Sequence, residues 1–144
     1  MEIKEDKKLK NIINFITGVL ATWLVYLLGG WDIALQLLVI GVLLDYITGI
    51  CKAIYKKKLN SEIGLKGIVK KIGYFVLVAV AVIIDKVTGE TGAIRTLVIY
   101  FFVANEGISI LENWGDMGVP FPKKLREILE QLRDNNNPKT KETK

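Results

Sequence analysis

The sequence predicts an all-α integral membrane protein with about four transmembrane helices, and with three at the least. Hydrophobic residues make up 51% of its 144 residues, and the mean hydropathy is +0.33. Four apolar stretches are close in length to the roughly 17 to 25 helical residues that cross a bilayer. A lysine-rich segment separates the second stretch from the third. We therefore expect a single membrane domain over residues 1–133, with little chain left for a domain outside the bilayer.

The first apolar stretch, residues 11–28, contains 18 consecutive residues without a charge. This length is enough to cross the hydrocarbon core. No small-x-small cleavage site stands at its end, so we expect a retained span and not a cleaved signal segment.

The second, third and fourth stretches cover residues 33–51, 69–87 and 93–111. Asp45 interrupts the second, and the fourth contains Arg95 and Glu106. The third and fourth have short uncharged cores. The spacing predicts helices in all three cases but leaves open whether three or four of the stretches span the membrane.

The segment between the second and third stretches carries seven lysines against one acidic residue, Glu62. By the positive-inside rule, this basic loop lies in the cytoplasm, and four spans then place both termini there too. Attraction to anionic lipid headgroups explains the charge better than nucleic acid, because no stacking aromatics alternate with the lysines. The lysines of the basic loop are Lys52, Lys56, Lys57, Lys58, Lys66, Lys70 and Lys71.

Residues 62–71 of this segment have two interpretations. Their lysines suit a helix that lies at the membrane interface before the chain turns into the third span. They also suit a third span that simply begins with snorkelling lysines.

The C-terminal part predicts a short cytoplasmic amphipathic helix over residues 122–133. A turn at residues 118–122 contains two prolines, and apolar residues then recur at helical spacing between charged ones. Such a helix packs on its own protein or on a partner, or lies on the membrane surface. The polar tail over residues 134–144 is expected to be disordered.

Polar residues within the spans are the candidate functional residues, because an ionisable group at bilayer depth needs a partner or water. Spacings of three and four residues place them in stripes on the second and fourth spans. Two interpretations stay open: carboxylates paired with Arg or Lys hold a bundle together, or the stripes line an oligomeric, water-filled opening. The candidates are Gly41, Asp45, Thr48, Gly49, Arg95, Asn105, Glu106, Ser109 and Asn113.

In a monomer, we expect Arg95 to pair with Asp45 or Glu106. Asp32 and Asp85 stand at the ends of spans, where we expect interfacial positions without a special role.

Enzymatic chemistry has little support. The chain has no histidine and one cysteine, Cys51. A Cys/His zinc cluster and an imidazole base are therefore excluded, as is a disulfide within the chain. We expect no catalytic residues, no metal and no cofactor.

Two combinations of residues resemble the toxin-secretion/phage-lysis holin family, of the phage holin family 4 type. The first is the run over residues 45–49 that closes a span, followed by residues 58–61 with Gly64 and Gly67. The second is Arg95 ahead of an aromatic run, followed by residues 105–113 and 118–125. The resemblance covers about residues 33–133. Family members are often described with about three spans, one fewer than the candidates here.

The resemblance implies a phage or prophage protein that oligomerises in the bacterial cytoplasmic membrane and permeabilises it. An endolysin, or in some relatives a toxin, is then released, and an antiholin is a possible further partner. The residues alone leave two other classes open. A small oligomeric transporter or ion channel would also use intramembrane carboxylates, and an antiholin or other regulatory membrane protein would share the same spans.

Overall fold

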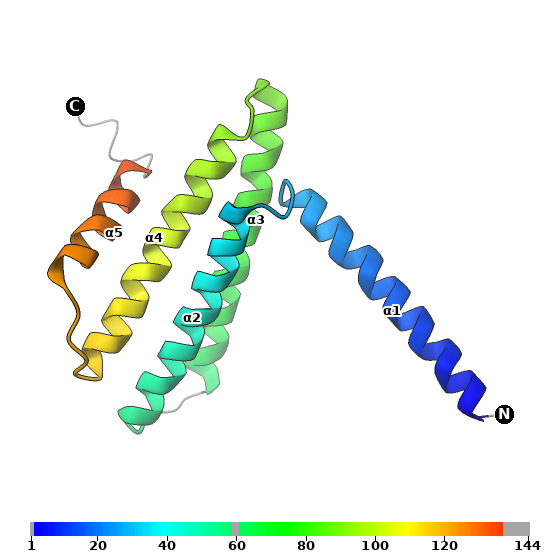
Figure 1. The fold of residues 1–144 in the computed structure, drawn as a ribbon, viewed down its shortest axis with the longest axis horizontal. Coiled ribbons are helices and arrows are strands. Elements are labelled where there is room, and N and C mark those ends of the chain that lie inside the picture. The colour runs from blue at the N-terminus through cyan, green and yellow to red at the C-terminus, as the bar shows by residue number, and fades with distance from the viewer. Residues whose placement is uncertain (1, 59–60, 137–144) are drawn as a thin grey trace.

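The computed structural model describes residues 2–58 and 61–136, with side chains over 6–58 and 64–136. In these ranges the chain forms five helices and no strand, which confirms the all-α prediction. Four helices, α1 to α4, are long and apolar enough to cross a membrane (Figure 1). The helices are α1 (Glu2–Leu27), α2 (Ile33–Tyr55), α3 (Ser61–Thr88), α4 (Ala93–Asp116) and α5 (Lys123–Asn135).

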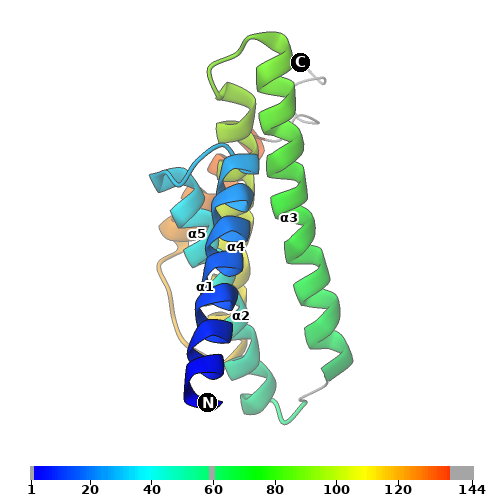
Figure 2. The ribbon, with the colours of Figure 1, turned by 90° about the vertical axis from the view of Figure 1, so that its right-hand side faces the viewer.

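Helix α4 is the centre of the fold, with α2, α3 and α5 packed around it. Leu38 of α2, Val78 of α3 and Ile99 and Phe102 of α4 form the buried core. Helix α1 projects away from these helices (Figures 1 and 2), and the apolar window of α1 buries none of its residues. An apolar helix that the described residues leave uncovered over most of its length is suited to lipid or to another transmembrane helix.

The two ends of the bundle differ in chemistry. At one end, here called the Arg95 end, lie the α1–α2 and α3–α4 turns. At the other, the basic end, Lys52 and Lys56 of α2 place their Nζ atoms 3.3 and 3.1 Å from a carboxylate oxygen of Asp116. The N-terminus lies toward the basic end in both views (Figures 1 and 2).

Helix α3 is one continuous helix from Ser61 to Thr88. Residues 62–71 therefore do not form a separate interfacial helix before a turn; the span begins with its lysines. No proline interrupts this segment, so nothing in the sequence forces a break. Consequently Lys66, Lys70 and Lys71 lie on a helix and not in a loop, which corrects the predicted basic loop.

Helix α5 confirms the predicted amphipathic helix and packs on its own protein. It runs back along α4 in the antiparallel direction (Figure 1). A β-carbon on Gly107 would lie 3.0 Å from the Leu129 methyl groups, and one on Gly115 would lie 3.1 Å from the Phe121 ring. These two glycines allow the close approach. Helix α5 takes in the first residues of the predicted tail, 134 and 135, while 137–144 lie outside the described residues.

Candidate functional site

One lysine lies between two carboxylates inside the helical bundle. Lys71 of α3 places its Nζ 2.8 Å from Oδ2 of Asp45 on α2, and it also donates a hydrogen bond to Oε2 of Glu106 on α4. Glu106 is 2% exposed. We call Asp45, Lys71 and Glu106 the Lys71 cluster. It brings together the two predicted polar stripes and joins all three helices of the bundle core.

Asn113 extends the cluster by one layer toward the basic end. Its side-chain amide donates hydrogen bonds to Oδ1 of Asp45 at 3.0 Å and to Oγ1 of Thr48 at 3.1 Å. The Thr48 hydroxyl in turn donates to the Asp45 carbonyl at 3.0 Å. In the described part of the chain, no buried side-chain nitrogen or oxygen lacks a hydrogen-bond partner. The interior is polar, but it is internally satisfied, as a stable buried network requires.

Small residues let α2 and α4 approach each other at this level. A β-carbon on Gly41 would lie 3.3 Å from Cβ of Glu106, and one on Gly49 would lie 3.8 Å from the Asn113 amide nitrogen. A larger residue at position 41 would push the Glu106 side chain away from Lys71. Gly41 and Gly49, two of the candidate residues, therefore stand where α2 lies close to α4 within one chain.

A cavity of about 630 Å³ opens beside the Lys71 cluster, between α3, α4 and the end of α5. Asn105 and Ser109, two of the predicted polar residues, are part of its wall. Its charged groups balance: three cations and three carboxylates. The residues that line it are Asp45, Gly67, Lys70, Lys71, Tyr74, Phe101, Phe102, Asn105, Glu106, Ile108, Ser109, Glu112 and Arg133.

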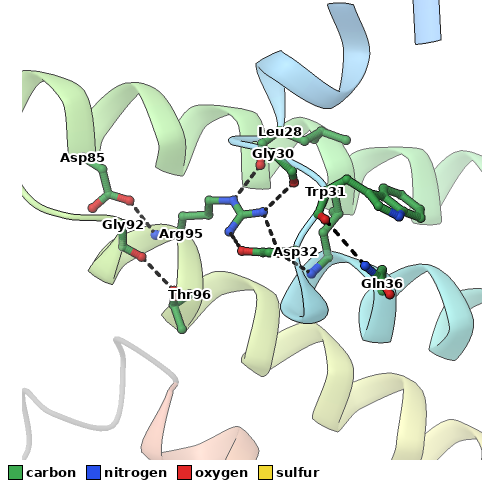
Figure 3. Close-up of polar contacts among 10 residues, drawn as sticks. Leu28, Gly30, Trp31, Asp32, Gln36, Asp85, Gly92, Arg95 and Thr96 are labelled. Atoms are coloured by element: carbon green, nitrogen blue, oxygen red, sulfur yellow. Dashed lines mark hydrogen bonds and ion pairs between the residues drawn. The ribbon is translucent and has the colours of Figure 1, made fainter. Parts of the chain in front are cut away.

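Arg95 forms a second charged cluster, at the Arg95 end of the bundle. Its guanidinium donates to the Leu28 carbonyl at 2.6 Å, to the Gly30 carbonyl at 3.2 Å, and to both carboxylate oxygens of Asp32 at 2.6 and 3.1 Å (Figure 3). The hydrogen bonds from Arg95 hold the pKa of the Asp32 carboxyl below its usual value. Arg95 thus satisfies the carbonyls that end α1 and fixes the turn into α2.

Gly29 allows this turn to wrap around Arg95. Its φ of +82° lies in the left-handed region, and a β-carbon there would stand 2.7 Å from Nε of Arg95. Both observations require glycine at this position.

Asp85 fixes the other turn at the Arg95 end. Its two carboxylate oxygens accept hydrogen bonds from the backbone N–H groups of Ile94 at 3.0 Å and Arg95 at 2.9 Å. These N–H groups belong to the first turn of α4, whose N-cap residue, Gly92, has no side chain to cap them. Asp85 therefore replaces the missing cap and also places its charge at the positive end of the helix dipole.

The structure changes the predicted pairing in three respects. Arg95 pairs with Asp32 and not with Asp45 or Glu106. The reason is distance, since 11 residues separate Arg95 from Glu106 on α4, or about 16 Å along the axis. Second, Asp32 and Asp85 do stand at the ends of spans, but each has specific partners, contrary to the expectation of no special role.

The third correction is that Lys71 is the partner of both interior carboxylates, although it had been assigned to the basic loop. Lys71 directly precedes the uncharged run over residues 72–84, and this position at the start of a span is the sequence signal for a partner of the carboxylates on the other spans.

The fold and these clusters define a class: a small multi-pass membrane protein whose charged side chains are neutralised inside the bundle. The chain belongs to the bacteriophage holin family, whose model matches residues 22–134. This confirms the resemblance found in the motifs and supports a multi-pass membrane protein of the holin type.

Relatives of similar size support the assignment. An uncharacterized 14.9 kDa protein of Clostridium perfringens is 46% identical over 88% of this chain and 98% of its own length. The Bacillus subtilis protein YqxH is 38% identical over 85% of each chain. A protein named "Probable holin" from Bacillus phage phi105 is 35% identical over 74% of this chain and 78% of its own. No solved structure matches the chain.

Proposed function

We propose that this holin-family protein oligomerises in the bacterial cytoplasmic membrane and opens a water-filled passage through which an endolysin, or a toxin, leaves the cell. The observation that carries the proposal is the Lys71 cluster beside the polar cavity. Three ionisable groups and several polar ones are held at bilayer depth, where an apolar interior would avoid the cost of burying them.

The closed bundle pairs these groups with one another. Two carboxylates share one ammonium, so the Lys71 cluster is not electrically balanced by itself. If α2, α3 and α4 separate, the charges face either lipid, which is costly, or water. Several copies that turn these faces toward a common lumen supply the water. The same polar groups therefore favour the closed bundle in a single copy and the open passage in an assembly.

The orientation that we propose has the basic end in the cytoplasm, with the N-terminus. Exposed Lys57 and Lys58 follow α2 at this end, and α1 carries Lys7, Lys8 and Lys10 near its start. This distribution follows the positive-inside rule, and the lysines suit anionic lipid headgroups.

Induced expression in a bacterial host tests the function, with and without an endolysin that lacks its own export signal. Membrane potential and culture turbidity are followed together. We expect abrupt, timed depolarisation in both cultures, and lysis only in the culture with endolysin. Continued growth with a polarised membrane would contradict the proposal. Delayed lysis in the presence of a second holin would instead identify an antiholin, and gradient-driven solute flux without cell death would identify a transporter.

A further inference from the structure

We propose that the outer face of α5 lines the water-filled opening of the assembled protein. The outer face consists of Lys123, Lys124, Glu127, Gln131 and Asp134, which are all exposed and recur at helical spacings of three and four. This inference rests on the proposed function, and it adds which surface meets the passing solute.

The first step is the depth at which α5 lies. Leu129 packs on Gly107, which stands nine residues before Asp116, the last residue of α4. This separation corresponds to about 14 Å along the helix axis. Arg133 lines the cavity together with Asn105, farther from the basic end. Because the hydrocarbon core is about 30 Å thick, α5 reaches toward its middle if α4 crosses it.

The second step is that α5 is specifically attached at this depth. Phe121 packs on Gly115, and Leu129 packs on Gly107 two turns farther along α4. Between these contacts, Nη2 of Arg126 lies 3.3 Å from Oε1 of Glu112. These two apolar contacts and the ion pair follow one another along both helices, so α5 packs on α4 at a defined position.

The third step is that the outer face cannot meet lipid at this depth. Its two lysines, Lys123 and Lys124, begin α5 near the basic end, whereas its carboxylates, Glu127 and Asp134, lie farther along the helix and therefore deeper. The Nζ of Lys124 lies 3.5 Å from the nearest Glu127 carboxylate oxygen, with both side chains more than half exposed. Ionised side chains at bilayer depth face water or a polar interior. The cavity beside Arg133 already provides a polar space next to the end of α5.

In a ring of copies, the apolar flank of α5 can contact a neighbouring copy while the charged outer face meets water. Leu125 and Ile128 remain 44% and 50% exposed after α5 has packed on α4, so an apolar flank is available for a neighbouring copy. The outer face then points to the lumen. Its formal charges cancel, so the wild-type opening should discriminate weakly between small cations and anions.

Ion selectivity of the full-length protein in planar bilayers tests this assignment. At about 10 mM KCl the Debye length is about 30 Å, so charges on the wall of a wide opening still influence passing ions. Rings of charged side chains set selectivity in this way. We expect Lys123→Glu/Lys124→Glu to raise the K⁺/Cl⁻ permeability ratio by about twofold or more, and Glu127→Lys to lower it. At about 1 M KCl, where the Debye length is about 3 Å, both effects should disappear.

A matched control makes the same change of charge as Glu127→Lys on α1. Asp6 is exposed on this helix, which projects away from the helix that carries Glu127 (Figure 1). Asp6→Lys keeps the basic charge of the N-terminal segment and should leave the permeability ratio close to that of the wild type.

A second measurement avoids variants that fail to assemble. The Glu127→Cys variant, in a Cys51→Ser background, is first allowed to form conducting openings in the bilayer. A positively charged thiol reagent is then added to the bath. We expect the permeability ratio to move toward Cl⁻ as the reagent reacts. Conducting openings whose selectivity is unchanged by the reagent and by both charge reversals would overturn the inference alone. A wild-type protein that never conducts would overturn the proposed function with it.

Discussion

The Arg95 and Lys71 clusters both neutralise charge within the membrane domain, but by different means. Arg95 spreads its guanidinium over two backbone carbonyls and one carboxylate, at a turn where each donor has a fixed acceptor. Lys71 uses a single ammonium for two carboxylates from two other helices, next to a polar cavity. The first arrangement ties chain segments together at the end of the bundle. The second arrangement ties three helices together at a place that borders the polar cavity.

This difference assigns different roles to the two ends of the bundle during permeabilisation. The Arg95 end should keep its geometry, because its planar guanidinium meets several acceptors at once. The helices around the Lys71 cluster should separate, because water can replace a point-charge contact with little geometric demand. Four predictions test this difference between the two clusters, in order of decreasing expected effect on stability.

Removing the ammonium has the largest expected effect. Lys71→Met leaves Asp45 and Glu106 without a counter-ion inside the bundle, and breaking a buried pair in this way costs about 3–5 kcal/mol. We expect a lower free energy of unfolding in detergent micelles and earlier depolarisation in cells. Lys10→Met, at an exposed position on α1 that does not line the cavity, is the control and should behave like the wild type. Equal unfolding midpoints for both variants would show that the ion pairs do not stabilise the closed bundle.

Exchanging arginine and lysine at the two cationic positions should lower stability by unequal amounts. Arg95→Lys removes the planar fork and leaves carbonyls at the end of α1 without donors, which costs about 1–3 kcal/mol. Lys71→Arg keeps the charge and can meet two carboxylates, so its cost should be smaller. Thermal unfolding of the two variants measures the difference. If Lys71→Arg proves the more destabilising of the two, the comparison between the clusters is wrong.

A methyl group at Gly29 should disturb the Arg95 end without changing any charge. Gly29→Ala places a β-carbon 2.7 Å from Nε of Arg95 at a positive φ, and such strain costs about 1–3 kcal/mol. Gly18→Ala is the matched control, since nothing lies within 4 Å of a β-carbon there. We expect a lowered unfolding temperature for the first variant only. A wild-type melting curve for Gly29→Ala would mean that the turn does not enclose Arg95.

The smallest effect should come from the charge of Asp32. The Arg95 guanidinium lowers the pKa of this carboxyl, so its stabilising contribution is present above the unfolded value of about 3.9 and is lost as pH falls through the folded pKa. Because the Asp32 side chain is 51% exposed, we expect less than about 1 kcal/mol.

Asp32→Asn isolates that contribution, because asparagine can still cap α2 by accepting from Leu35 N–H. The variant should unfold more easily than the wild type at pH 7, and the difference should shrink below about pH 4 and vanish once the pH falls below the lowered pKa of Asp32. If the two proteins differ in free energy of unfolding by the same amount at neutral and at acid pH, the ion pair between Asp32 and Arg95 is not the source of the difference.

Much of the fold follows from the sequence because hydrophobic length and spacing determine transmembrane helices directly. The stripes that contain Asp45 and Asn113 were predicted as helix faces, and the structure brings those faces together. Which carboxylate pairs with Arg95 could not be predicted from hydrophobic length and spacing. Arg95 and Glu106 share a helix, and only the geometry of the α1–α2 turn shows that Asp32 reaches the guanidinium first. The antiparallel return of α5 likewise depends on how Leu129 fits the space at Gly107, which spacing alone does not encode.

The most direct test of the central claim measures when water reaches the Lys71 cluster. In a Cys51→Ser background, Ser109→Cys reports on the cavity and Ile99→Cys on the fully buried core. A membrane-impermeant charged thiol reagent is applied to cells before and after depolarisation. We predict that Ser109→Cys reacts only after depolarisation and that Ile99→Cys stays unreactive. An unreactive Ser109→Cys in depolarised cells, or equal reaction at both positions, would contradict the account.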